Sequence, residues 1–273
     1  HRYRIDLKLV PRETPVGDTL NTSYSSRLKF MLNQEKHPEF SNSFVLGIDA
    51  DDTLWENEAG FYKIQDRFFE LLSPWSEAHD TNSALLENER ASIPQYGYGV
   101  TSFVKSMITT AIQISDSEIE TKEITKIISW GDELINAPVD VLPDVEETLS
   151  ELSNSHHLLL ITKGDVLHQK AKVENSGLSD FFWDVEVVGE KDPAVYEMLL
   201  NRYGIKPEMF VMIGNSVSSD ILPVLNIGGK AIHVPHHTTW ELEIPDSNEL
   251  ENIDFPVAQN ISEVPEILSG WIK

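Results

Sequence analysis

Hydrophobic residues along this chain form two kinds of pattern, short and largely continuous runs and longer stretches with helical spacing. Runs of strand length occupy residues 44–48, 157–162, 185–188, 210–214 and 231–234. Such a run is typical of a strand that is buried on both faces of a parallel sheet. From the second run onwards the runs alternate with helical patterns. This alternation predicts an α/β fold with a parallel sheet and helices on both of its faces.

The interval between the first two runs has a different pattern. From Trp55 to Leu72 the apolar residues recur at helical spacing, and further helical stretches follow at residues 83–93, 99–114 and 117–135. No strand pattern interrupts them, which indicates an all-helical insertion. The expected breakpoints between these helices are Pro94, Gly97 and Gly99.

These patterns divide the chain into three parts. Residues 44–54 and 138–273 are expected to form a Rossmann-like catalytic core, and residues 55–137 a helical cap that is inserted after the first strand. Residues 1–43 are an N-terminal extension whose role the sequence does not indicate.

Composition narrows the range of partners. The 273 residues include 45 acidic and 21 basic side chains, a net charge of −24, and this field disfavours nucleic acid and anionic membrane as partners. A small anionic substrate would need local cations, either lysines or a bound metal. The absence of cysteine excludes disulfides, thiolate metal sites and a cysteine nucleophile. No signal-peptide pattern or membrane-length apolar run is present, so we expect a cytoplasmic protein.

Polar residues of different kinds follow the predicted strands. The carboxyl ends of parallel strands meet at one edge of a sheet, where ligands of open α/β proteins bind. Acids, a hydroxyl and lysines would therefore gather at this edge, and hard oxygen ligands of this type suit Mg²⁺. The residues concerned are Asp49, Asp51, Thr162, Lys163, Lys191, Asn215 and Asp220.

Four segments carry a family resemblance. Residues 49–54 (DADDTL) resemble the first motif of the haloacid dehalogenase-like (HAD) hydrolase superfamily, and residues 160–164 (LITKG) resemble its second. Residues 191–193 (KDP) are similar to the third motif, and residues 213–221 (IGNSVSSDI) to the fourth. The resemblance covers about residues 44–235 in the family's order and spacing. The helical insertion after the first motif is where the family places its C1-type cap.

The resemblance implies a role for each motif residue. Asp49 would attack phosphorus and form an aspartyl-phosphate, while Asp51 would act as general acid and then general base. Mg²⁺ would be held by the carboxylates of Asp49 and Asp220 and by the backbone carbonyl of Asp51. The expected phosphate-binding residues are Thr162, Lys163 and Lys191. Asn215 stands where most members carry an acid, so we expect it in the metal's surroundings without adding charge.

Asp51 also separates branches of the family. The dehalogenase branch lacks an acid there, because a halide leaves without a proton, whereas an alkoxide needs one. The sequence therefore predicts a phosphatase that acts on a small phosphorylated metabolite. A phosphomutase or other phosphotransferase, and a non-catalytic metabolite-binding module on the same fold, remain alternatives. The sequence does not indicate the substrate or the oligomeric state.

The cap and the histidine pairs give weaker signals. The cap aromatic residues at helical spacing, including Phe61 and Phe68, are interpreted as core. Neither His156-His157 nor His236-His237 is interpreted as a metal-ligand pair, because one lies at a strand start and the other in a loop. The cap residues with polar side chains that could face the site are Glu56, His79, Arg90, Tyr98 and Lys105.

Overall fold

The computed structural model describes residues 43–244 and 253–271. The chain divides into two units, residues 1–39 and residues 40–273, and all described residues belong to the second. Nearly all of the predicted N-terminal extension therefore lies outside the described residues. No helix of the described part is long and apolar enough to cross a membrane.

The centre of the molecule is a sheet of five parallel strands in the order β3-β2-β1-β4-β5. The parallel sheet predicted from the apolar runs is thus confirmed. The first strand, β1, lies in the middle, with β2 on one side and β4 on the other. This reversal of strand order places the carboxyl ends of β1 and β4 at a topological switch point. The strands are β1 (Val45–Ile48), β2 (His157–Lys163), β3 (Asp184–Val188), β4 (Phe210–Gly214) and β5 (Lys230–His233).

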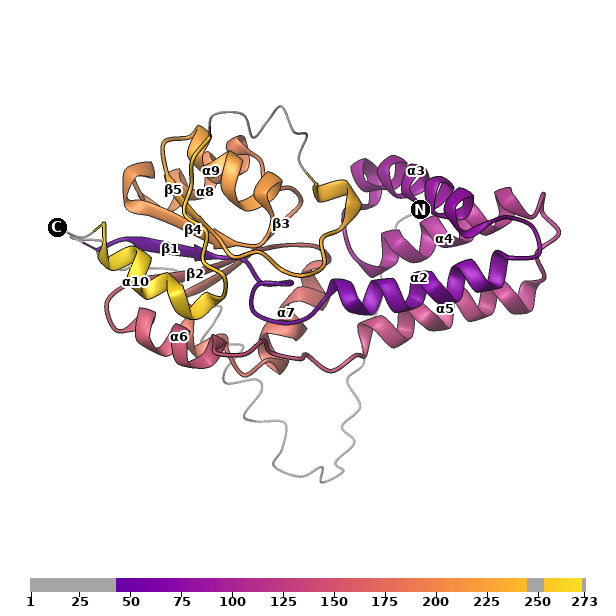
Figure 1. Ribbon diagram of the computed structural model, residues 1–273, viewed down its shortest axis with the longest axis horizontal. Coiled ribbons are helices and arrows are strands. Elements are labelled where there is room, and N and C mark those ends of the chain that lie inside the picture. Colours follow the sequence, from indigo (N-terminus) through magenta and orange to yellow (C-terminus); the bar gives the residue numbers. More distant parts are fainter. Residues whose placement is uncertain (1–42, 245–252, 272–273) are drawn as a thin grey trace, which may run out of the picture. The chain divides into compact units, whose positions relative to one another are not determined.

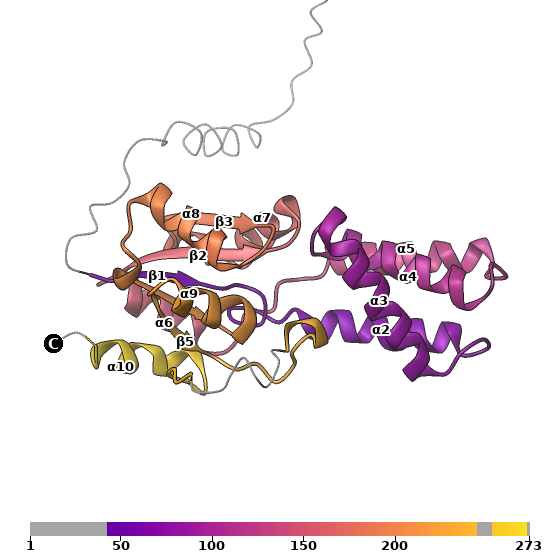
Figure 2. The same cartoon turned by 90° about the horizontal axis from the view of Figure 1, so that it is seen from above.

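Helices cover both faces of the sheet, as Figures 1 and 2 show. On one face, apolar side chains of α6, α7 and α10 pack against Leu46, Ile48 and their neighbours. On the other face, α8 and α9 pack against Val45 and the strands beside it. These helices are α6 (Val145–Ser153), α7 (Val166–Asn175), α8 (Pro193–Tyr203), α9 (Leu222–Asn226) and α10 (Val264–Ser269). The short helical turns of the described core are η1 (Ser179–Phe181), η2 (Pro207–Met209), η4 (Glu241–Glu243) and η6 (Ile261–Glu263).

Five helices lie between β1 and β2 in the sequence, and we call the first four of them, α2 to α5, the cap helices (Figure 1). They have an apolar core of their own, in which Phe68, Met107 and Ile127 are fully buried. The periodicity predicted an all-helical insertion, and these helices agree with it. The division of the chain into a cap at residues 55–137 and a core stays a prediction. The cap helices are α2 (Glu58–Leu72), α3 (Ala78–Tyr96), α4 (Val100–Ile114) and α5 (Thr121–Ile135).

Several helix boundaries differ from the prediction, among them the starts of α3 and α5, and three of the differences have a local cause in the chain. Pro94 does not end α3, which continues to Tyr96 and stops at Gly97 with φ +72°. A proline removes one backbone hydrogen bond, and near a helix end that loss is tolerated. Helix α6 begins at Val145 rather than at Pro143, because Asp144 adopts a left-handed conformation with φ 62°.

The third difference is the helix predicted from residue 217 to 226. It opens with a π-helical turn, η3 (Val217–Ile221), before α9 continues it. Pro223 has no N–H to donate to the carbonyl of Ser219, and that carbonyl instead accepts a hydrogen bond of 3.1 Å from the Tyr196 hydroxyl. π-helical turns are frequent at functional sites, and this one carries Asp220.

The two connections between sheet and cap helices run side by side. Trp55 forms an antiparallel bridge with Val141, and the N–H of Glu56 donates to the carbonyl of Asp140 at 2.9 Å. The Leu142 N–H donates to the Leu54 carbonyl at 2.9 Å. The segment that leaves β1 is therefore joined by hydrogen bonds to the segment that returns from α5.

Candidate active site

A cavity of about 1100 Å³, counted out to its open mouth, lies where the carboxyl ends of the strands face the cap helices. Its core wall comes from the loops after β1, β2, β3 and β4, and its cap wall from α2, α3 and α4. Clefts of this kind are the usual ligand sites of α/β proteins. All seven predicted site residues line it: Asp49, Asp51, Thr162, Lys163, Lys191, Asn215 and Asp220.

Asp49 follows β1 and is held on both sides of its carboxylate. The Thr53 hydroxyl donates to Oδ2 at 3.0 Å, and the Lys191 ammonium forms an ion pair with Oδ1. Thr53 is itself fixed across the sheet, because the backbone N–H of Asn215 donates to its hydroxyl at 3.1 Å. Asp49 is 6% exposed, so its carboxylate is almost fully buried and its orientation is fixed by these contacts.

Lys191 joins the first and fourth strand ends. Its ammonium also lies 2.7 Å from Oδ1 of Asp220, whose second oxygen accepts a hydrogen bond of 3.0 Å from the Ser216 N–H. A side chain at Gly214 would overlap the Asp220 carboxylate, so only glycine lets that group lie against the end of β4. The prediction that the separate strand ends converge in space is thus confirmed for Asp49, Lys191 and Asp220.

This cluster contains two buried carboxylates and a single ammonium. Burial raises the pKa of Asp49 to about 7, and Lys191 only partly counteracts it. Burial likewise raises the pKa of Asp220 against the opposing effect of Lys191. For Lys191, burial favours the neutral amine, but the two carboxylates outweigh it and hold the pKa well above its usual value. The cluster is therefore one positive charge short of neutrality when both acids are ionised.

A divalent cation fits this excess of negative charge. The oxygen atoms available are the carboxylates of Asp49 and Asp220 and the side-chain carbonyl of Asn215, which lies 3.4 Å from the Thr53 hydroxyl. Mg²⁺ prefers such hard oxygen ligands and is usually held by one or two carboxylates together with water and phosphate. An added positive charge would lower the pKa of both acids.

Asp51 has a different environment from Asp49, two residues away. Its Oδ1 accepts from the Trp55 indole at 2.6 Å and from the Lys172 ammonium at 2.5 Å. Its Oδ2 accepts from the Gln169 amide at 2.8 Å. Burial alone would raise the pKa of Asp51, but Lys172 and these hydrogen bonds outweigh it and the pKa lies below its usual value. The carboxylate form of Asp51 is thus stabilised here.

Thr162 and Lys163 are the last two residues of β2, and both line the cavity. Thr162 is 1% exposed, and its hydroxyl has one long contact of 3.4 Å with the Lys163 carbonyl. The Lys163 ammonium forms an ion pair with Glu243, lies 2.9 Å from the Ser219 hydroxyl and sits over the Tyr98 ring at 4.3 Å. Lys163 therefore joins the core wall to η4 and the cap wall, and its role as a phosphate ligand stays a prediction.

Asp52 is a turn residue, and its carboxylate also caps the start of α2. Its φ is 60°, and its carboxylate accepts hydrogen bonds from the backbone N–H groups of Asn57 at 2.8 Å and Glu58 at 3.2 Å. These are free N–H groups at the start of α2. Burial raises the pKa of Asp52 to about 6, although these hydrogen bonds oppose the shift.

The cap wall is acidic as well as aromatic. Burial raises the pKa of Glu58 to about 8, and the nearby carboxylates of Asp52 and Glu243 add to the shift. Burial raises the pKa of Glu89 to about 7, and its Oε2 has no hydrogen-bond partner. Neither acid forms an ion pair with a lysine or arginine of the described residues. Phe61 contacts Phe103 in the cap core and also lines the cavity, so its interpretation as core alone was incomplete.

Of the five polar cap residues singled out from the sequence, only Tyr98 lines the cavity. Its hydroxyl donates to Glu190 at 2.6 Å, and its ring meets Trp240 edge to face at 5.9 Å between centroids. The prediction was wrong for the other four, because helical spacing does not show which side of a helix faces the cavity, and Glu56 precedes the first cap helix. These four are Glu56, His79, Arg90 and Lys105.

Several residues of the site were missed by sequence reasoning. Thr53 belongs to the first motif, and its position four residues after Asp49 in a tight turn was an available signal. Gln169 and Lys172 lie on α7, and no pattern in the sequence shows that their side chains reach Asp51. Glu243 lies in η4, far from every motif, and its pairing with Lys163 depends on the path of the chain after β5.

Comparison with known proteins agrees with the motif resemblance. A family model for haloacid dehalogenase-like hydrolases matches residues 45–228. A haloacid dehalogenase-like family hydrolase from Xanthomonas campestris has a closely similar structure, with a TM-score of 0.74 and 34% sequence identity. That similarity covers 86% of this chain and 94% of the other.

Curated relatives match over shorter stretches. Glyceraldehyde 3-phosphate phosphatase of Methanothermobacter thermautotrophicus is 36% identical over 132 residues, which are 46% of this chain and 58% of that enzyme. Human N-acylneuraminate-9-phosphatase is 36% identical over 93 residues, 32% of this chain and 38% of the relative. The chain thus spans between about two fifths and three fifths of these two relatives. Fold, motifs and family model agree, and the chain belongs to the haloacid dehalogenase-like hydrolases.

Proposed function

We propose that the protein is a Mg²⁺-dependent phosphomonoester hydrolase that acts on a small phosphorylated metabolite through an aspartyl-phosphate intermediate. The observation that carries the proposal is the pair of carboxylates after β1, each with its own lysine. Asp49 pairs with Lys191, and Asp51 pairs with Lys172. Two carboxylates in different environments suit two different tasks, nucleophile and proton shuttle. The two curated relatives, both named as phosphatases, support the same reaction class.

Asp49 is the proposed nucleophile. The Thr53 hydroxyl and the Lys191 ammonium hold its carboxylate at the cavity floor. An oxygen of Asp49 attacks phosphorus, which forms a new O–P bond and breaks the P–O bond to the alcohol. Bound Mg²⁺ would neutralise the crowded carboxylates and the charge on the phosphoryl group. Thr162 and Lys191, both buried at the cavity wall, are the proposed donors to the phosphoryl oxygens.

Asp51 is the proposed general acid and base. In its protonated form it gives its proton to the departing alkoxide, and it then takes a proton from the water that attacks the aspartyl-phosphate. This second step breaks the bond between Asp49 and phosphorus and releases phosphate. The three donors around Asp51 favour its carboxylate form, which is the form needed for the second step. If the Lys172 ammonium moved away from Asp51, the protonated form of Asp51 that the first step needs would be favoured.

The cap wall suggests the chemical class of the substrate. Glu58 and Glu89 face the cavity without a partner of opposite charge among the described residues. When these two acids are ionised, a carboxylate or second phosphate on the substrate would meet a repulsion that an uncharged, hydroxyl-bearing alcohol avoids. We therefore propose a phosphomonoester whose alcohol part is neutral. The archaeal relative is named for glyceraldehyde 3-phosphate, whose remaining groups carry no charge, whereas the human relative is named for N-acylneuraminate, which carries a carboxylate.

The proposal is tested with a panel of phosphomonoesters, each measured with Mg²⁺ and after treatment with a chelator. Glyceraldehyde 3-phosphate and 3-phosphoglycerate form a matched pair, because the first carries an aldehyde at the position where the second carries a carboxylate. We expect hydrolysis only with Mg²⁺, and a kcat/KM at least about tenfold higher for the aldehyde. Product analysis with a sugar phosphate distinguishes hydrolysis from transfer to a second hydroxyl.

Asp49→Asn is the decisive variant. It keeps the shape of the side chain but removes the nucleophilic oxygen, so turnover of every substrate in the panel should fall below detection. Asp180→Asn, on the exposed turn η1, is the matched control and should retain full activity. Turnover by a folded Asp49→Asn variant, judged by circular dichroism, would overturn the assignment.

A further inference from the structure

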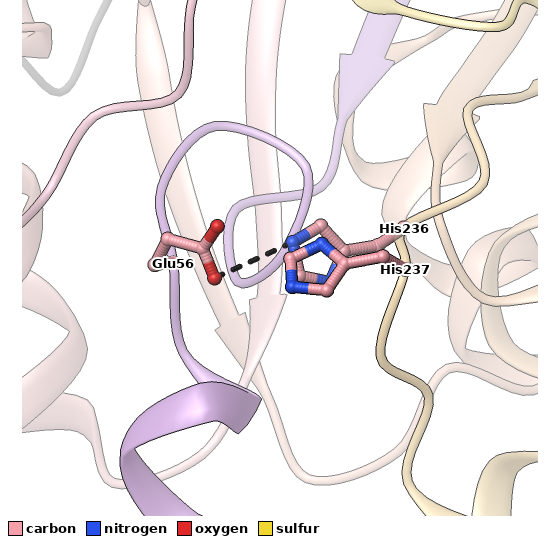
Figure 3. A group of neighbouring side chains, drawn as sticks. All are labelled: Glu56, His236 and His237. Carbon is pink, nitrogen blue, oxygen red and sulfur yellow. Dashed lines mark ion pairs between the residues drawn. The ribbon is translucent and has the colours of Figure 1, made fainter.

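Outside the cavity described above, three side chains that favour metal ions come together. Glu56 lies in the connection from β1 to the cap helices, and His236 and His237 follow β5 (Figure 3). One ligand atom from each residue lies within 4.8 Å of the other two. The three belong to segments about 180 positions apart in the sequence, so the fold itself creates the cluster. Sequence reasoning had not interpreted the His236-His237 pair as ligands.

Two atoms of the cluster lack a hydrogen-bond partner although they are buried. They are Nε2 of His236 and Oε2 of Glu56, which lie 3.5 Å apart and face each other. The His236 side chain is 6% exposed, so water reaches it poorly. Buried polar atoms are normally satisfied, so an orphaned pair of this kind is unusual. A cation between the imidazole nitrogen and the carboxylate would satisfy both atoms at once.

The other nitrogen of His236 is held in place. Its Nδ1 lies 2.8 Å from the Thr238 hydroxyl and 3.2 Å from the Thr238 carbonyl, with the Asp52 carboxylate at 3.6 Å. Metal-binding histidines commonly donate their second N–H to a carbonyl or carboxylate, which fixes the ring and leaves the other nitrogen free for the metal. With the proton on Nδ1, His236 has this arrangement and its Nε2 is directed at Glu56; in the other tautomer Nδ1 accepts from the Thr238 N–H at 3.3 Å.

The spacing of the cluster suits a small transition-metal ion. Zn²⁺ binds histidine nitrogens and carboxylate oxygens at about 2.1 Å, and tetrahedral geometry then separates two ligand atoms by about 3.4 Å. The separation between His236 and Glu56 is 3.5 Å. The His237 ring lies beside that of His236, with 4.1 Å between centroids, and a small rotation would bring its nitrogen to the same distance. Imidazole ligands also disfavour Mg²⁺, which prefers oxygen.

We propose that Glu56, His236 and His237 form a binding site for a divalent transition-metal ion of the Zn²⁺ type, with water as the fourth ligand. This ion is separate from the Mg²⁺ of the proposed reaction. Glu56 is joined to the returning cap connection through Asp140. The segment after His237 contacts the cap helices as well, since the Tyr62 hydroxyl donates to the Thr239 carbonyl at 3.0 Å. The ion would therefore tie the root of the cap to the segment that follows β5.

The test is a titration of chelator-treated protein with Zn²⁺ by calorimetry, and with Co²⁺ by visible absorption, in the presence of saturating Mg²⁺. We expect one ion per chain, with Co²⁺ bands typical of nitrogen and oxygen ligands, and an increase in the melting temperature. His236→Ala and His237→Ala should each weaken binding at least about tenfold and abolish the thermal stabilisation. Glu56→Gln is a milder third variant that keeps the proposal testable if a histidine variant fails to fold.

Two control variants distinguish binding at this cluster from binding elsewhere on the protein. His79→Ala removes an exposed cap histidine and should leave Zn²⁺ affinity unchanged. Asp220→Asn disables the proposed Mg²⁺ site and should also leave it unchanged, so the outcome does not depend on whether the phosphatase proposal holds. Absence of Zn²⁺ binding to the wild-type protein, or equal binding by the His236→Ala variant, would overturn the proposal. Either result would identify the cluster as a simple pairing of His236 with Glu56 and Asp52.

Discussion

The core wall and the cap wall of the cavity differ in how they treat buried acids. On the core wall, Lys191 contacts Asp49 and Asp220, and Lys172 contacts Asp51. On the cap wall, Glu58 and Glu89 line the cavity without an ion pair to a lysine or arginine in the described part of the chain, and the pKa of each is raised, to about 8 and about 7. Only the core wall supplies ammonium groups that oppose the effect of burial, and of its three acids only Asp51 has a pKa below its usual value.

This difference separates the proposed chemistry from the proposed selectivity. A nucleophile and a proton shuttle need defined protonation states, and nearby ammonium groups provide them. Acids on the cap wall need no charge to donate or accept hydrogen bonds, but once ionised they repel an anionic group. The core wall would then set the reaction, while the cap wall would choose among phosphomonoesters. Because the two walls come from separate segments of the chain, single substitutions can change one wall at a time.

The largest effect is expected when the core wall loses its central ammonium. Lys191→Met would leave Asp49 and Asp220 facing each other without their shared cation and would remove a proposed phosphoryl donor. Removing one such electrostatic contact usually costs a factor of about 10²–10³ in kcat. We expect a loss of at least that size, measured with the best substrate of the panel at saturating Mg²⁺.

Lys206→Met is the control for this variant, because it removes an exposed lysine from the same core. Its kcat should equal that of the wild-type protein. A Lys191→Met variant that folds normally and retains more than about a tenth of the wild-type kcat would contradict the role given to this lysine.

Strand ends were the part of the site that sequence could predict. Asp49 and Asp51 come directly after β1 and Thr162 lies at the carboxyl end of β2, so their position along the chain fixes their position at the sheet edge. Lys172 lies in the last turn of α7, and which side chains of this helix reach the site depends on the rotation and tilt of the helix. Neither quantity follows from hydrophobic periodicity, so α7 was predicted correctly and its contribution to the site was not.

The secondary structure likewise contains elements that the sequence pattern predicts and features that it does not. The strands and most helices were predicted because burial imposes a pattern on each of them. The π-helical turn at η3 has no such pattern, since it depends on Pro223 and on the Tyr196 hydroxyl from another helix. Likewise, the cluster of Glu56, His236 and His237 depends on two loops that meet only in three dimensions.

A change on the cap wall should produce the next largest effect, on stability rather than activity. Glu89 has an ordinary pKa of 4.5 when unfolded and about 7 when folded, so folding favours its protonated form. The stability that this preference provides is present below about pH 4.5 and is lost as the pH rises through about 7. Glu89→Gln stays neutral, so its advantage over wild type should grow by about 2 kcal/mol between about pH 5.5 and pH 8.

Denaturant unfolding at several pH values measures this difference. Glu87→Gln is the control, because it removes an exposed acid from the same helix and should follow the wild-type curve. Parallel stability curves for Glu89→Gln and wild type would contradict the view that the cap wall carries an unfavourable charge near neutral pH.

The smallest change alters the charge beside the proton shuttle without removing a catalytic residue. Burial would raise the pKa of Asp51, and Lys172 is the main group that holds it below its usual value. Lys172→Met should therefore raise this pKa, and the limb of the pH profile of kcat/KM at which Asp51 loses its proton should move about one unit towards higher pH. Lys172→Arg keeps the positive charge and should leave that limb near its wild-type position. A limb that stays in place in Lys172→Met, or moves equally in both variants, would mean that Asp51 is not the proton donor, and the contrast between the two walls would then concern stability alone.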